Sequence, residues 1–468
     1  MFRIIPKFED NARITGFSQT VLGKLVLLAI FGLTLSAMGG VDKSRLLILA
    51  FLSAITFLPK IRRFLVLACT VLVTNFFWFE HGILDRVAKA EAIEPTHREL
   101  LIWIILPFML TCAVLMWIAA KRPQGWFARR PLLWLLGLYA ALVGIACYAP
   151  LHGFLRFALW SYLLIFVSYF WYLAYAVRDR ATPGGDNLVA QFATFHPFWG
   201  GTTVPFPKGA SYWRRIEAKT PAELGTTMIK GVKLIVWCFL LSTLNHYYLD
   251  LAYRKFGVPS LGACLQAFSA GRPFHPMMNW VSLVTAGLAD LLTISIWGHM
   301  TIATCRMAGF RALRNTYAPL SSRTVAEYWN RYYFYFKELL VDMFFYPTFI
   351  HCFTHYRKLR IFFATFVAVW LGSTLFHFMR DTHHISISGL PNAIIHYPYA
   401  VYSIVLALAI SISQVRQRPS HGSRRWWRER LTAPVCVFGF FCILSVFETA
   451  GASVGLCLHF LVYLFSGR

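Results

Sequence analysis

His377 is the residue of this sequence whose type and setting point most directly to catalysis. It ends the apolar run 371–376 and is followed by Phe378. A neutral imidazole is tolerated in an apolar helix and can accept a proton near neutral pH. His377 could therefore take the proton of an acceptor hydroxyl while the oxygen attacks a thioester carbonyl. The alternative is a packing histidine that hydrogen-bonds to a neighbouring carbonyl.

A second group of polar residues lies upstream, in the aromatic segment 328–347. Its charged members are Arg331, Lys337, Glu338 and Asp342. Because a charge facing lipid is costly, these side chains must pair with each other, line a wet cavity or lie at the membrane interface. Arg331 and Lys337 could bind a phosphate of phosphopantetheine or CoA. The alternative is an interfacial amphipathic helix whose charges are solvated.

The remaining histidines carry weaker signals. His351 and His355 are four residues apart, a spacing that permits metal ligation on a helix. Without a third ligand we predict no metal site. His383 and His384 are adjacent in a polar stretch and are expected to be solvated.

These residues must be positioned by membrane helices. Hydrophobic residues make up 57% of the 468 residues and charged residues 14%, whereas soluble domains carry about 25% charged residues. Apolar runs long enough to span a bilayer occur at 21–40, 64–80, 100–120, 132–149, 157–177, 229–252, 279–304, 361–378 and 398–414. The runs 46–58 and 338–353 are shorter, and 434–466 is long enough for a helical hairpin.

We therefore expect an all-α polytopic membrane protein, with residues 1–468 forming a single membrane domain. Roughly 11–12 transmembrane helices are expected, together with re-entrant or interfacial helices. The lipid bilayer is its first predicted partner. The formal net charge of +25 comes from Lys and Arg clusters between apolar runs, and no basic helix or known module suggests a nucleic-acid partner.

The distribution of charge predicts the topology. With the N-terminus inside, the acid-rich stretch 80–99 falls outside. The basic regions that then fall inside are 60–63, 121–130 and the cytoplasmic or interfacial loop 178–228. The basic cluster 416–430 falls inside only if 338–353 dips into the membrane and returns, so this run is predicted to be re-entrant.

The segment 289–378 resembles a known family on several motifs. Residues 328–333 resemble an aromatic-Trp-Arg-Arg-Trp-His motif, and 341–347 resemble Arg-Asp-Tyr-Leu-Tyr-Ile-Pro. The matching positions are Trp329, Arg331, Asp342 and Pro347. Residues 306–310 and 315–319 resemble the upstream motifs Arg-Met-Leu-Gly-Phe and Asn-Phe-x-x-Pro-Tyr, and 375–377 resemble Leu-Trp-His-Gly. The family is the membrane-bound O-acyltransferases, in the bacterial branch of alginate O-acetylation and teichoic-acid D-alanylation proteins.

The resemblance implies that 289–378 is the catalytic core region and that His377 is the catalytic residue. It implies an acyl-CoA or acyl carrier protein thioester as co-substrate, no further cofactor, and a hydroxyl acceptor on a glycan, lipid or small molecule. Tyr333 replaces the first histidine of the family and Phe378 its glycine. Because a tyrosine pKa is about 10, we predict His377 alone as the base.

Around this base, Tyr333 or Asn330 is expected to help by hydrogen bonding. Trp329, Arg331 and Asp342 are expected to help bind substrate. The location that follows is a multi-pass protein of the cell membrane, in a bacterial inner membrane, with its N-terminus in the cytoplasm.

Two other functions stay open. Asp290 and His299 within 279–304 favour a transporter or channel, although residues nine apart face roughly opposite sides of a helix. Tyr333 at the histidine position favours a non-catalytic scaffold of the same family.

Overall fold

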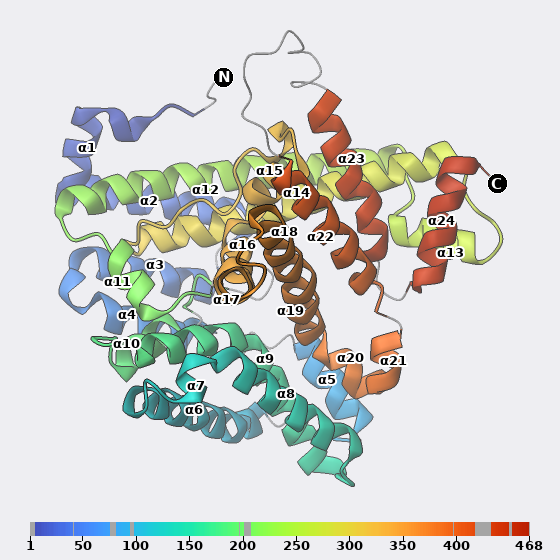
Figure 1. Ribbon diagram of the computed structural model, residues 1–468. Coiled ribbons are helices and arrows are strands. Elements are labelled where there is room, and N and C mark those ends of the chain that lie inside the picture. Colours follow the sequence, from blue (N-terminus) through green and yellow to red (C-terminus); the bar gives the residue numbers. More distant parts are fainter. Residues whose placement is uncertain are drawn as a thin grey trace. The chain divides into compact units, whose positions relative to one another are not determined.

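The regular structure of this protein is helical. The computed structural model describes residues 5–40, 42–74, 81–93, 98–195, 197–200, 207–395, 397–416, 432–448 and 452–467. Within these ranges the only β-type pairing is an isolated bridge between Glu217 and Phe310. The expectation of an all-α protein is confirmed (Figure 1).

Two compact units make up the chain. Unit 1 comprises Met1–Phe239, His299–Leu313 and Met379–Leu390, and unit 2 comprises Leu240–Gly298, Arg314–Phe378 and Pro391–Arg468. The chain passes from one unit to the other within the helices α12 (Pro221–Leu249), α14 (Pro276–Met307) and α19 (Ser373–Arg380). Each unit is described by itself below.

Seven helical segments of the described residues are long and apolar enough to cross a membrane. They are Ile104–Lys121 in α6 (Arg98–Lys121), α8 (Pro131–Tyr148), α9 (Gly153–Ala181), Pro221–Lys255, α14, Arg357–Arg380 and Leu390–Val415. Two bent pairs raise the number to as many as nine: α1 (Ala12–Gln19) with α2 (Val21–Ala37), and α3 (Lys43–Phe57) with α4 (Arg62–Cys69) and its π-helical continuation. The chain is therefore a multi-pass helical membrane protein.

The final apolar run, 434–466, is divided between two helices, as expected. α23 spans Ala433–Ser445 and α24 spans Val454–Ser466. The Ser453 side chain accepts a hydrogen bond from the backbone N–H of Leu456, so it caps α24 at its N-terminus. The N-cap at Ser453 begins a new helix and helps explain why these 33 apolar-rich positions do not form a single span.

The run 338–353 is helical as far as His351 but changes its hydrogen-bond pattern on the way. It is divided among α16 (Phe334–Leu340), a π-helical turn over Val341–Phe345 and α17 (Tyr346–His351). Pro347 lies in the first turn of α17 and has no N–H to donate to the preceding π-helical turn. The backbone is right-handed helical at both junctions, and the re-entrant position of this run in a membrane stays a prediction.

Two stretches expected to be loops contain helices. Within 178–228, α10 (Leu188–Thr194) and α11 (Ala210–Ile216) lie between the end of α9 and the start of α12. Residues 201–206 of this stretch lie outside the described residues. Within 379–397, α20 (Thr382–Ser388) and α21 (Leu390–Ile395) follow α19. The basic positions 418–430 also lie outside the described residues.

Candidate active site

His377 lies half-buried on α19 among aromatic rings of unit 2. The centroid of its ring is 3.9 Å from that of Tyr399, with a tilt of 34° between the planes. Phe376 and Phe336 lie at 5.4 and 5.9 Å, at steep interplanar angles of 75° and 83°. Rings from α16, α19 and α22 (Tyr399–Val415) therefore surround the imidazole.

Two hydroxyl contacts join α19 to α22 one helical turn before His377. The hydroxyls of Ser373 and Tyr399 lie 3.0 Å apart, and those of Thr374 and Ser403 lie 2.6 Å apart. Hydrogen bonds between helices are one of the forces that hold membrane helices together. They fix α22 against the turn of α19 that precedes His377.

Close packing of two π-helical turns connects this site to the upstream segment. One turn spans Val341–Phe345 and the other spans Ala368–Gly372, directly before α19, and they pack against each other. A Cβ atom on Gly372 would lie 2.8 Å from side-chain carbons of both Leu340 and Phe344. Only glycine permits this approach, and π-helical turns are frequent at functional sites.

Trp329 and Tyr333 are both buried and both contact Phe336. The ring centroids of Trp329 and Phe336 are 6.0 Å apart, and those of Tyr333 and Phe336 are 5.5 Å apart. Since Phe336 also contacts His377, the structure gathers these three predicted site residues around one phenyl ring. No motif or spacing indicated that Phe336 would be their common neighbour.

The charged residues of the segment pair with close neighbours. Arg331 forms an ion pair with Glu327 at 2.6 Å and donates to the Ser321 hydroxyl at 2.6 Å. Lys337 pairs with Glu338 at 3.3 Å. Pairing within the group, one of the expected outcomes, is found for Lys337 and Glu338, whereas Arg331 pairs with a residue outside it. Asn330 is exposed on α15 (Val325–Tyr332), and Asp342 is half-buried in the first π-helical turn.

Asn315 fixes the start of α16 from a distance in the sequence. Its side-chain oxygen accepts the backbone N–H of Tyr335 at 3.2 Å, and its carbonyl accepts that of Phe334 at 2.9 Å. The N–H groups of the first helical turn have no partner within a helix. The buried Asn315 supplies two acceptors there, so this motif residue holds α16 in place.

The motif 306–310 has a structural role in unit 1. The guanidinium of Arg306 donates to the carbonyl of Ala312 at 2.8 and 3.0 Å. Gly309 has a φ of +87°, and a Cβ atom there would lie 2.8 Å from the Arg62 guanidinium. Arg62 is itself buried and paired with Glu217 at 3.1 Å. The segment 289–378 is thus shared between the two units.

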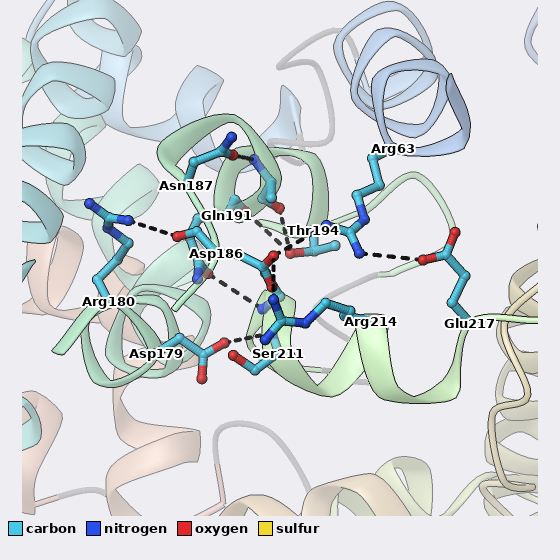
Figure 2. A network of polar contacts seen from close by, with 12 residues as sticks. Arg63, Asp179, Arg180, Asp186, Asn187, Gln191, Thr194, Ser211, Arg214 and Glu217 are labelled. Carbon is cyan, nitrogen blue, oxygen red and sulfur yellow. Dashed lines mark hydrogen bonds and ion pairs between the residues drawn. The ribbon is translucent and has the colours of Figure 1, made fainter. Parts of the chain in front are cut away.

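A polar network in unit 1 was missed by the sequence analysis (Figure 2). One carboxylate oxygen of the buried Asp186 accepts from Arg63 at 3.2 Å and from Arg214 at 3.3 Å. The Asp186 carbonyl accepts from Arg180 at 2.8 Å. The network links α4, α9 and α11, and it neutralises part of the basic region 178–228. The few acidic residues within this basic region could have indicated such ion pairs.

The histidine pairs differ from expectation. His351 ends α17 and His355 lies beyond it, so they do not share a helical face and that prediction was wrong. His383 and His384 lie on α20 with ring centroids 4.1 Å apart. Burial, followed by the neighbouring His384, lowers the pKa of His383 to about 4. Over the part of the chain that the structure describes, no three His, Cys, Asp or Glu residues are grouped to hold a metal.

The fold and this site define a class, a multi-pass helical membrane protein with an aromatic-walled histidine. Compared with known proteins, the sequence matches no family model and no curated relative.

Proposed function

We propose that this protein is a membrane-embedded O-acyltransferase with His377 as its general base. It would move an acyl group from a thioester, carried by CoA or an acyl carrier protein, to the hydroxyl of a glycan, lipid or small molecule. One observation carries the proposal. A half-buried imidazole lies against Phe336, in the segment where the acyltransferase-like motif residues Trp329, Arg331 and Asp342 occur.

The chemistry needs one proton carrier. His377 takes the proton of the acceptor hydroxyl while the oxygen attacks the thioester carbonyl carbon. The carbon–sulfur bond then breaks, and the departing thiolate takes the proton back from the imidazolium. Tyr333 is assigned to contact and orientation, because a phenol is a weak base at neutral pH. Aromatic walls around the imidazole would limit hydrolysis of the thioester by water.

The same proposal includes an arrangement in the membrane. Among the described residues, up to nine long spans together with the shorter apolar helices α23 and α24 would give eleven crossings, within the proposed range of eleven to twelve. The N-terminus lies in the cytoplasm of a bacterial cell, and 334–351 is re-entrant from that side. The acyl thioester then approaches from the cytoplasm, as the basic inner regions favour.

The direct test is a search for the product. Glycans and lipids extracted from cells with and without the protein are compared by mass spectrometry for ester-linked acyl groups. The proposal expects an ester that is present only with the protein and is removed by mild alkali. Identical ester profiles in both cells, with the protein present in the membrane, would argue against an acyltransferase.

One observation favours a transporter instead. Asp290 is exposed on the membrane span α14, and it forms no ion pair with any other described residue. Intramembrane carboxylates of this kind commonly mark ion or substrate pathways. Flux of a solute through proteoliposomes that contain no thioester, and its loss in Asp290→Asn, would favour this second function.

A further inference from the structure

Tyr399 covers a ring face of the His377 imidazole. Tyr399 lies at a centroid distance of 3.9 Å with a tilt of only 34°, whereas Phe336 and Phe376 approach at steep angles. At this separation the two rings are in van der Waals contact over a face. Rotation of the imidazole about its side-chain bonds would break that contact, so Tyr399 limits its orientation.

Tyr399 is itself held on three sides. Its ring is buried and stacks on Tyr402 at 4.8 Å with an interplanar angle of 25°. Its hydroxyl lies 3.0 Å from that of Ser373, which precedes His377 by one helical turn. Its backbone begins α22 immediately after Pro398, whose ring fixes the preceding φ. Because these contacts fix the Tyr399 ring, that ring can hold the His377 imidazole in place.

We propose that Tyr399 is a positioning residue for His377. The tyrosine ring face holds the imidazole in one orientation, and the bond to Ser373 ties that ring to the helix that carries the histidine. The ring face also carries negative electrostatic potential, which favours the imidazolium formed when His377 takes a proton. The catalytic consequence rests on the proposed acyltransferase function, whereas the contact does not.

The first test measures the contact without any acyl transfer. The purified full-length protein in nanodiscs is treated with diethyl pyrocarbonate, and carbethoxylation of His377 is followed by mass spectrometry, with the exposed His384 as the internal reference. Tyr399→Leu and Tyr399→Met are expected to label His377 severalfold faster than the wild type. Tyr399→Phe keeps the ring face and is expected to label at nearly the wild-type rate.

Two variants without the ring guard against misfolding, since leucine and methionine have similar volumes but different shapes and flexibility, so a packing defect of one need not be shared by the other. Wild-type labelling rates in Tyr399→Met, with an unchanged melting temperature, would overturn the proposal. Labelling in Tyr399→Phe as fast as in Tyr399→Leu would also overturn it, because the hydroxyl and not the ring face would then be responsible.

The second test separates the positioning role from the proposed function. Tyr399→Met is expected to lower kcat for acyl transfer about tenfold with little change in KM, because orientation of a reacting group affects the rate more than binding. Tyr399→Phe is expected to rescue most of kcat. Equal kcat in Tyr399→Met and wild type would overturn the role. A wild type that transfers no acyl group, while labelling follows the predicted order, would refute the acyltransferase and leave the contact established.

Discussion

At the scale of single residues, an ion pair accommodates a charged side chain that is buried in the protein. Lys233, on the membrane helix α12, is buried and bonds both carboxylate oxygens of Glu9 at 2.6 Å. A lysine facing lipid would be costly. Glu9 therefore joins the N-terminal segment Phe8–Asp10 to α12 within unit 1.

Replacing Glu9 by Gln is expected to destabilise the protein by about 1.5–3 kcal/mol, because a hydrogen bond between charged groups is lost and Lys233 stays buried. Unfolding of the variant in detergent measures this change. The exposed pair of Lys7 and Asp10, at 3.2 Å, is the matched control. Asp10→Asn is expected to change stability by less than about 1 kcal/mol. Equal effects of the two substitutions would contradict the account.

The same pair predicts a pH dependence. Burial alone would raise the pKa of Glu9, but the hydrogen bond and charge of Lys233 outweigh it and the pKa is lowered from its ordinary 4.5. A lowered pKa in the folded state means that the stabilisation is complete above pH 4.5 and is lost as the pH falls through the folded value. Unfolding of wild type and Glu9→Gln between neutral and acid pH should therefore converge at low pH.

At the scale of elements, hydropathy predicted the long helices well. The runs 100–120, 132–149 and 157–177 correspond to α6, α8 and α9, since about twenty apolar residues are needed to span a bilayer. The contact of His377 with Tyr399 was not predictable, because the residues belong to different helices and no local pattern links them. The Asp186 network was not predictable for the same reason, because Arg63 and Arg214 lie on different helices.

The packing of the two π-helical turns supplies a prediction for this scale. Gly372→Ala is expected to destabilise the protein by about 1–3 kcal/mol, because the added carbon overlaps Leu340 and Phe344. Gly439→Ala on α23 is the control, since nothing lies within 4 Å of a Cβ atom there. Thermal unfolding in detergent compares the two variants. A Gly372→Ala variant as stable as Gly439→Ala would show that these turns can separate without cost.

At the scale of the whole molecule, charge placement predicts which loops share a side of the membrane. Single cysteines at Arg122, Lys358 and Ser388, all exposed positions, are introduced into a variant without native cysteines. A membrane-impermeant maleimide is expected to label Ser388→Cys in intact cells, and Arg122→Cys and Lys358→Cys only after permeabilisation. This outcome follows if 334–351 returns to the side from which it entered.

Labelling of Lys358→Cys in intact cells would mean that 334–351 crosses the membrane. The basic positions after α22 would then lie outside, against the distribution of charge that the sequence shows. The topology is therefore tested separately from the chemistry at His377.

The most direct test of the central claim is the ester content of cells that express His377→Ala. The exposed His384 on α20 provides the matched control, His384→Ala. With equal amounts of protein in the membrane, ester-linked acyl groups measured by mass spectrometry should fall to background in His377→Ala and stay at the wild-type level in His384→Ala. Wild-type ester content in His377→Ala would contradict the account.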